Sequence, residues 1–225
     1  MIKFKNVKKW YQNGTVKAVD NISFEIQRGE FVFLTGHSGS GKTTLLKLIF
    51  KGINPDSGQI FIDNQNITSL RESKIPYLRR KIGVVFQDFK LLYNKTVYEN
   101  TSYIMNVLKI SKSNVKIKSE KILKELGLWY KRDVFPHMLS SGEQQRAAIA
   151  RALVNEPLII LTDEPTGNLD VENGKNIIEL LRNLHFKGTT VIMATHNNDF
   201  TKMFNSRIIS LKDGAIVEDK KNLNS

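Results

Sequence analysis

The segment Gly36–Thr43 constrains the fold more than any other part of the sequence. Its residues, GHSGSGKT, directly follow the apolar run FVFLT and open the run TTLLKLIF. A Gly-x-x-x-x-Gly-Lys-Thr spacing between a strand and a helix is typical of a phosphate-binding loop. The glycines let backbone N–H groups point at phosphate oxygens, and the helix N-terminus adds its positive dipole. The segment therefore predicts a strand, a nucleotide-binding loop and a helix within an α/β domain.

Each residue of this loop is a candidate nucleotide contact. Lys42 can reach the β- and γ-phosphates, and the Thr43 hydroxyl can bind Mg²⁺. We expect ATP and Mg²⁺ as cofactors. The candidate nucleotide-binding residues of this segment are Gly36, His37, Ser38, Gly39, Ser40, Gly41, Lys42, Thr43 and Thr44.

Two further apolar runs end in polar residues that can act on phosphate. LIILTDE places Asp163 and Glu164 after one run, and TVIMATH places His196 after another. Ligands of open α/β sheets bind at the carboxyl ends of the strands, so these side chains should meet the phosphates. Asp163 suits Mg²⁺ binding, Glu164 suits a general base that polarises water, and His196 suits a donor to the γ-phosphate.

A second anion-binding turn follows in LSSGEQQRAAIARAL, which begins at Leu139. A Ser-Ser-Gly turn that opens a helix offers a hydroxyl, free N–H groups and a positive helix end. One nucleotide rarely needs two γ-phosphate sites on the same chain. The second site makes sense if it closes over the nucleotide of a neighbouring subunit, which predicts a homodimer in the ATP-bound state.

The apolar pattern predicts the arrangement of the remaining elements. FVFLT, LIILT and TVIMA lack alternation, which favours a parallel sheet covered on both faces, whereas the early strands resemble an antiparallel layer. We therefore expect one α/β domain over residues 1–225: a P-loop (RecA-like) parallel-sheet core with an antiparallel β layer and an inserted helical sub-domain. The core should span about residues 1–87 and 156–225, and the helical sub-domain about residues 88–155.

Composition limits the kind of partner. The chain has no cysteine, no run of 18 apolar residues and a net charge of +12. Residues 71–95 carry seven Lys or Arg against two acids, and residues 109–132 carry eight against two. This basic face fits a nucleic-acid groove, a surface near anionic lipid or a solvated lysine-rich face. Few aromatics interrupt the lysines, which argues against base stacking and a specific nucleic-acid partner.

Over its whole length the sequence resembles the ATP-binding subunits of ABC transporters. The resemblance implies a catalytic set of Glu164, His196, Gln87 and Lys42. It also implies that Thr43, Gln87 and Asp163 bind Mg²⁺. It implies nucleotide contacts from Tyr11 and Asp170, and from Ser140, Gly142 and Gln144 across the dimer. The segments that carry it are Tyr11 (adenine stacking), Gly36–Thr43 (Walker A), Gln87 (Q-loop), Leu139–Gln144 (signature), Ile159–Asp163 (Walker B), Glu164, Gly167–Asp170 (D-loop) and His196 (switch).

Two positions depart from the pattern of this family. Ser141 replaces the first glycine usual in the signature, and Thr162 replaces a small apolar residue before Asp163. A Cβ at Ser141 is expected to weaken the contact across the dimer if the backbone there needs glycine's freedom.

Within the family, several stretches are similar to the FtsE group of bacterial cell-division ATPases. They are FLTGHSGSGKTTLLKLI, IPYLRRKIG, VFQDFKLL, TVYEN and DEPTGNLD. This resemblance implies an integral membrane partner of the FtsX type, regulation of peptidoglycan hydrolysis, and a peripheral location at the cytoplasmic face of the inner membrane. Membrane contact is expected through the partner. The alternatives are an ATPase of a lipoprotein-releasing or macrolide-type exporter and a soluble nucleic-acid-associated ABC ATPase.

Overall fold

An antiparallel sheet forms one outer layer of the fold. The computed structural model describes residues 1–197, 200–201 and 206–221. The strand order in this sheet is β2-β1-β4-β5, and every neighbouring pair is antiparallel. In β1, Ile2 and Phe4 are buried while Lys3 and Lys5 are exposed, as the two-residue period of a half-covered sheet requires. The strands are β1 (Ile2–Tyr11), β2 (Val16–Ile26), β4 (Ser57–Ile62) and β5 (Gln65–Asn66).

A second, six-stranded sheet forms the centre of the molecule. Its order is β10-β9-β3-β8-β7-β6, and all neighbours are parallel except β10, which runs antiparallel to β9. The parallel core and the antiparallel layer predicted from the apolar pattern are both confirmed. The strands are β3 (Phe31–Thr35), β6 (Ile82–Val85), β7 (Ile159–Asp163), β8 (Thr190–Ala194), β9 (Arg207–Lys212) and β10 (Ala215–Lys220).

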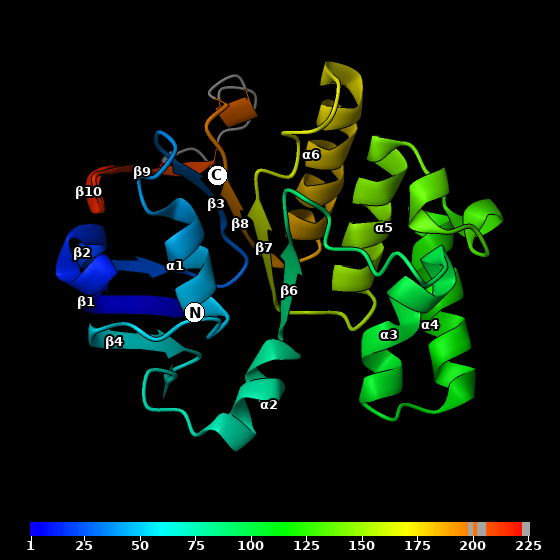
Figure 1. The fold of residues 1–225 in the computed structure, drawn as a ribbon, viewed down its shortest axis with the longest axis horizontal. Helices are drawn as coiled ribbons and strands as arrows, with labels where there is room; N and C mark the ends of the chain where they lie inside the picture. Colours follow the sequence, from blue (N-terminus) through cyan, green and yellow to red (C-terminus); the bar gives the residue numbers. More distant parts are fainter. Residues whose placement is uncertain (198–199, 202–205, 222–225) are drawn as a thin grey trace.

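Helices cover both faces of the central sheet (Figure 1). Helix α1 (Lys42–Ile49) lies between the two sheets, where its buried Leu45, Leu48 and Ile49 join one hydrophobic core. Helices α5 (Ser141–Leu153) and α6 (Val171–Phe186) cover the opposite face and belong to a second core. Helices α3 (Val97–Val107) and α4 (Lys112–Glu125) pack beyond α5.

Polar caps fix where the main helices begin. Thr96 and Glu99 form a reciprocal capping box at α3, and Ser140 and Glu143 form another at α5. Asp170 caps α6 by accepting a hydrogen bond from the backbone N–H of Asn173 at 2.9 Å. Each cap satisfies N–H groups that the first turn of a helix leaves without partners.

Several short elements were not predicted from the sequence. Helix α2 (Ile75–Arg79) follows a 3₁₀ turn (Glu72–Lys74), and its second residue is Pro76, which suits a first helical turn. The remaining 3₁₀ turns are Gln12–Gly14, Trp129–Lys131 and Pro136–Met138. None of the helices in the described ranges combines the length and apolar character that a membrane span requires.

The register of the central sheet brings its functional loops to one edge. Asp163 of β7 lies beside Ala194 of β8, and Leu34 of β3 lies beside the same Ala194. Because these strands are parallel, the segments that follow them emerge together. The phosphate loop, Glu164, His196 and Gln87 are therefore neighbours although they lie far apart in the sequence.

Candidate active site

A cavity of about 490 Å³ opens at this edge of the sheet. The segments that follow β3, β6, β7 and β8 contribute to it. The lining residues are His37, Ser38, Gly39, Gly41, Lys42, Thr43, Thr44, Gln87, Asp163, Glu164 and His196. The structure thus brings together most of the candidate residues, including all four of the candidate catalytic set.

The phosphate loop has a backbone that only glycine adopts easily. Gly36, Gly39 and Gly41 have φ values of 141°, 80° and 108°. Gly41 is also the residue that precedes α1, and a Cβ there would collide with the carbonyl oxygen of Ala18. Two constraints, positive φ and close packing, therefore require glycine at position 41.

Lys42 lies over the mouth of the loop and already bonds to it. Its Nζ donates to the carbonyl oxygens of Gly36 (2.7 Å) and His37 (3.0 Å). Burial lowers the pKa of the Lys42 ammonium, and the charges of Glu164 and Asp163 oppose that shift. The cation is held in place before any ligand arrives, which lowers the ordering cost of binding phosphate.

Thr43 and Asp163 are joined across the cavity by a hydrogen bond. The Thr43 hydroxyl donates to Asp163 Oδ2 at 2.7 Å. Burial raises the pKa of Asp163; the charge of Glu164 adds to this, and the Thr43 hydrogen bond opposes it. A cation bound here would stabilise the ionised carboxylate. Hydroxyl and carboxylate oxygens are the donors that Mg²⁺ prefers, so this pair fits that ion.

Glu164 and His196 form the second polar pair of the cavity. His196 Nδ1 lies 2.8 Å from Glu164 Oε1, and the Glu164 side chain is only 12% exposed. The Glu164 backbone has φ of 48°, and its N–H donates to the carbonyl oxygen of Ala194 at 2.9 Å. A left-handed conformation in a non-glycine residue is strained, and here it lies at a site of chemistry.

Gln87 joins the cavity to the loop that follows the Walker B strand. Its side chain is exposed and lines the cavity, and its carbonyl oxygen accepts a hydrogen bond from Asn168 Nδ2 at 2.9 Å. Sequence reasoning did not single out Asn168. The signal that could have found it was its place inside the segment Gly167–Asp170.

The signature residues do not line this cavity. Ser140, Gly142 and Gln144 lie at the N-terminus of α5, whereas the lining comes from the four sheet loops. Ser140 is exposed, and its hydroxyl accepts a hydrogen bond from the Glu143 N–H at 3.3 Å. Gln144 Nε2 donates to the Leu139 carbonyl oxygen at 3.2 Å. Ser140 and Ser141 face solvent, whereas Gly142 is buried and Gln144 is half-buried.

Ser141 needs no glycine-like backbone. It is exposed, it is the first residue of α5, and it is absent from the described residues with positive φ. The backbone reason for expecting a weaker contact therefore does not apply at Ser141. The tighter position is Gly142, where a Cβ would lie 3.0 Å from Asn173 Oδ1, so that this side chain would have to shift by a few tenths of an ångström.

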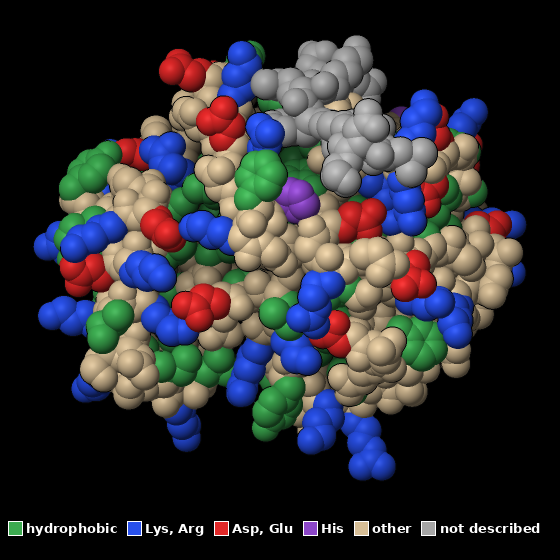
Figure 2. Space-filling model, turned by 180° about the vertical axis from the view of Figure 1, so that it is seen from behind, with side chains coloured by type: hydrophobic (Ala, Val, Ile, Leu, Met, Phe, Trp, Pro, Cys, Tyr) green, Lys and Arg blue, Asp and Glu red, His purple; other side chains and the backbone are tan. Residues whose placement is uncertain are grey.

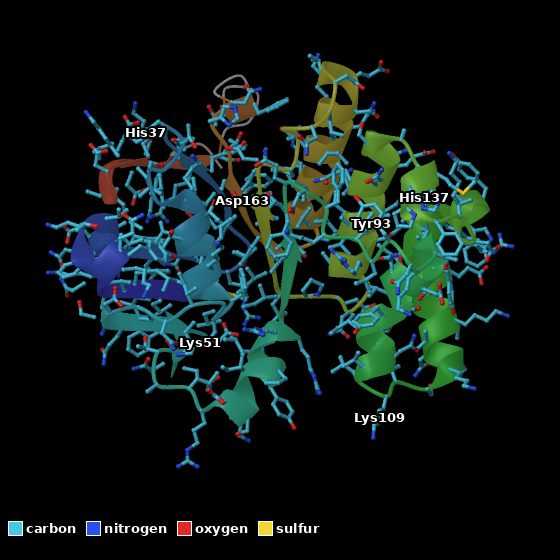
Figure 3. All side chains as sticks on the ribbon, in the orientation of Figure 1. His37, Lys51, Tyr93, Lys109, His137 and Asp163 are labelled. Carbon is cyan, nitrogen blue, oxygen red and sulfur yellow. The ribbon has the colours of Figure 1, made fainter. Side chains whose placement is uncertain are left out.

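Tyr11 and Asp170 also lie outside the cavity lining. Tyr11 ends β1, is 37% exposed and has the Lys9 ammonium 5.7 Å from its ring. Asp170 caps the N-terminus of α6, and hydrogen bonds from the Asn173 N–H and side chain lower its pKa. The Nδ1 atom of His37 lies 2.7 Å from the Ser38 carbonyl oxygen, and Figure 3 shows His37 at the upper left, with Asp163 nearer the centre of the molecule.

The two basic stretches belong to different elements. Residues 71–95 include α2 and β6, and residues 109–132 include α4. Ion pairs offset part of the positive charge of residues 109–132. Two of them are Lys118–Glu156 at 3.1 Å and Lys124–Glu120 at 2.7 Å. Figure 2 shows Lys and Arg spread over one face with Asp and Glu between them. Among the described residues on that face, no continuous single-sign groove of the kind that tracks a nucleic acid is visible.

Comparison with known proteins decides the family. The sequence pattern described as "ABC transporter" matches residues 19–167, which is more than half of the chain. The chain belongs to the ABC transporter family. This ABC protein is 44% identical over 220 residues to the cell division ATP-binding protein FtsE of Bacillus subtilis, covering 98% of this chain and 96% of that protein. It is 42% identical over 216 residues to FtsE of Escherichia coli K12, covering 96% and 97%.

Solved structures agree with this ABC fold. The ATP-binding cassette MJ0796, in a dimeric post-hydrolysis state bound to ADP and phosphate, matches with a TM-score of 0.91 and 38% identity over 100% of both chains. CbiO1 of Clostridium perfringens, part of an ABC transporter complex, matches with a TM-score of 0.89 and 32% identity, covering 98% of this chain and 88% of that one. The predictions of an ABC ATPase and of its fold are confirmed.

Proposed function

We propose that this chain is the ATP-binding and ATP-hydrolysing subunit of an FtsEX-type complex in cell division. In this proposal two copies close over two ATP molecules. Closure moves an integral membrane partner of the FtsX type, which in turn regulates peptidoglycan hydrolysis. The similarity to FtsE proteins of several bacteria supports the biological role.

One observation carries the dimer proposal. The cavity of one chain supplies the groups for phosphate, cation and water, yet the second anion-binding turn lies outside it, with Ser140 and Ser141 exposed to solvent. The N-terminus of α5 can bind an anion. Because this turn lies outside the cavity, a nucleotide in the cavity of the same chain does not supply that anion. A second copy that presents its phosphates to Ser140 and Gly142 gives the turn a ligand, and the dimeric state of MJ0796 supports this arrangement.

Each residue in the cavity has a proposed task. Lys42 binds the β- and γ-phosphates, and the loop N–H groups hold their oxygens. Glu164 accepts a proton from the attacking water, and His196 holds that carboxylate and donates to the γ-phosphate. Tyr11 stacks on adenine. Gln87 and Asp170 contact the site from its edge, and Ser140, Gly142 and Gln144 contact it from the second copy.

Mg²⁺ is the proposed metal, and Thr43, Asp163 and Gln87 are the residues that would hold it. The Thr43–Asp163 hydrogen bond and the raised pKa of Asp163 support this assignment. The described residues contain no group of three or more His, Cys, Asp or Glu that could hold a metal ion alone. A cation here would therefore need phosphate oxygens or water to complete its ligands. When bound, Mg²⁺ neutralises phosphate charge.

The helical part of the chain is the proposed contact with the membrane partner. We infer that residues 88–155 act as a helical sub-domain on the core formed by residues 1–87 and 156–225. Gln87 and residues 88–100 join the cavity to this sub-domain and would touch the partner. The subunit would then be peripheral at the cytoplasmic face of the inner membrane, with its basic stretches near anionic lipid.

Site-specific cross-linking tests the dimer. Because the sequence contains no cysteine, a Ser38→Cys chain and a Ser141→Cys chain, both also carrying Glu164→Gln, each have the introduced cysteine as their single thiol, and each chain treated alone is the background control. Mixed and treated with a short bifunctional thiol reagent, they should form a cross-linked pair that depends on ATP. A yield that is the same with and without ATP would contradict the proposal.

A further inference from the structure

The loop between β6 and α3 has an unusual backbone for a segment without glycine. Phe89 and Lys90 have φ values of 58° and 49°, so two successive non-glycine residues adopt the left-handed region. Such residues persist only where the surroundings hold them. The loop begins at Gln87 in the nucleotide cavity and ends at Thr96, the cap of α3.

Arg151 of α5 holds this strained turn. Its guanidinium donates to the carbonyl oxygen of Phe89 at 2.8 Å and to that of Lys90. The two bonds reach across more than 60 residues of sequence and bind two successive carbonyls. Burial lowers the pKa of the Arg151 guanidinium, and no ion pair with an acidic side chain is found for it within the described ranges. Its compensation comes from the two carbonyl oxygens.

Asn100 of α3 holds the other end of the same loop. Its Oδ1 accepts from the Leu92 N–H at 2.8 Å, and its Nδ2 donates to the Leu92 carbonyl oxygen at 3.0 Å. Tyr93, labelled in Figure 3, lies between Leu92 and Lys95, whose carbonyl oxygen also accepts from Asn100 Nδ2 at 2.9 Å. Tyr93 is 56% exposed. The loop is thus fixed from two helices while its tip remains accessible to a partner.

Helix α5 connects the anchored loop to the signature turn. Ser140 caps its N-terminus and Arg151 lies in its last turn, eleven residues further on, which is about 16 Å along a helix axis. Ala147, Ala148, Ile149 and Ala150 between them are buried in the core. A packed helix moves as one body, so displacement of one end is felt at the other.

We propose that Arg151 is a positioning residue that couples the loop after β6 to the signature turn through helix α5. The inference rests on the proposed ATP-driven dimer and adds the side chain that transmits its closure. When the signature turn binds the nucleotide of the second copy, α5 shifts and Arg151 carries the strained turn with it. Force from a partner at Tyr93 follows the same route in reverse.

The geometry requires arginine at this position. A guanidinium offers several N–H donors in one plane and can bind two successive carbonyls at once. Lysine keeps the charge but presents a single ammonium on a flexible stem, so it cannot fix both carbonyl oxygens. Arg151→Lys should therefore loosen the link without removing the charge.

Hydrogen exchange on the purified chain tests the inference without a membrane partner. All variants carry Glu164→Gln so that ATP is not consumed. ATP should slow exchange at the signature amides of Glu143 and Gln144, and at the loop amide of Leu92. In Arg151→Lys the signature amides should still respond, whereas the response of Leu92 to ATP should fall at least about tenfold.

Two further variants complete the experiment. Arg132→Lys is the matched control, because Arg132 also donates to a backbone carbonyl (Trp129, 3.2 Å) but not in this loop. It should leave both responses unchanged. Arg151→Gln, which keeps one amide group as a donor, is measured in parallel. If one of the two Arg151 variants fails to fold, the other still tests the inference.

The outcomes separate this inference from the proposed function. If Leu92 responds to ATP in an Arg151 variant as in the parent, the coupling role of Arg151 is wrong while the dimer stands. If the signature amides of the parent do not respond to ATP, the proposed dimer is wrong and the coupling falls with it.

Discussion

His196 Nδ1 lies 2.8 Å from Glu164 Oε1, and this contact joins the ends of two neighbouring parallel strands. The imidazole is 67% exposed and the carboxylate 12%, so the histidine covers the acid on its solvent side. This arrangement leaves Glu164 aimed at the cavity that Lys42 and Thr43 line. The pair is the geometric basis for assigning water activation to Glu164.

Lys42→Ala should abolish most of the affinity for ATP. Charged hydrogen bonds of this kind contribute about 1.5–3 kcal/mol, so the Kd for ATP should rise by roughly ten- to a hundredfold. Calorimetric titration measures it. Lys47→Ala is the matched control, because Lys47 is an exposed lysine on the same helix and does not line the cavity. Equal ATP affinity of Lys42→Ala and the parent would contradict the assignment.

Thr162→Val should stabilise the protein. Thr162 is fully buried in β7, and its hydroxyl has no hydrogen-bond partner among the described residues. Valine has nearly the same shape and removes the orphaned group, which costs about 1 kcal/mol or more. We expect Tm to rise by about 2–4 °C in a thermal melt. A lower Tm would mean that the hydroxyl has a partner, such as an internal water.

The fold and much of the site were predictable because their signals are local. FVFLT–GHSGSGKT–TLLKLIF specifies strand, loop and helix within one segment, and β3 and α1 follow it closely. The sequence predicts that Glu164 and His196 both reach the phosphates, because each follows a buried strand, and the parallel register of β7 and β8 brings these two residues to the same edge of the sheet. Their hydrogen bond could not be predicted, because it depends on the left-handed backbone at Glu164.

Other contacts had no sequence signal. Arg151 lies in an ordinary helical run, and its bonds to Phe89 and Lys90 arise only when α5 packs beside the loop. Helix α2 was missed because its five residues are too short to show a helical period and contain proline. At Ser141, the glycine expected from the family pattern suggested backbone strain, whereas helix α5 begins at that residue without it.

Asp219→Asn should reduce stability in a pH-dependent way. Arg207 is buried and donates to both Asp219 oxygens at 2.7 Å, and this bonding lowers the pKa of Asp219. The Asp219 contribution is therefore complete above its unfolded pKa of about 3.9 and disappears as pH falls through the lower folded value.

The expected loss at pH 7 is about 2 kcal/mol, less than for a fully broken buried pair, because Glu30 still accepts from Arg207 at 3.0 Å. Urea unfolding at pH 7 and at successively lower pH measures it, and the difference between the two proteins should shrink as the pH falls through the lowered folded pKa of Asp219. A difference that is unchanged by pH would contradict the ion-pair account.

Charge reversal on α4 should separate lipid contact from partner contact. Lys112→Glu, Lys116→Glu and Lys118→Glu together should remove the weak binding of the isolated chain to anionic vesicles, since each nearby lysine contributes about 1 kcal/mol. Binding to membranes that contain the partner should change far less. Vesicle sedimentation measures both.

A triple reversal of Lys5, Lys8 and Lys17 on the antiparallel sheet is the control for net charge. It should leave vesicle binding largely intact. The membrane assignment of the basic stretches would be wrong if the purified chain bound duplex DNA or RNA below about 1 μM at physiological salt, tighter than ordinary non-specific binding.

The most direct test of the account is ATP turnover and dimer content of Glu164→Gln. Glutamine keeps the shape of the side chain and cannot accept the proton from water. It should bind ATP with the parent affinity, hydrolyse it at least about 100-fold more slowly, and accumulate as a dimer by light scattering. Hydrolysis at the parent rate, or a chain that remains monomeric at saturating ATP, would contradict the central role of Glu164 and the closed dimer.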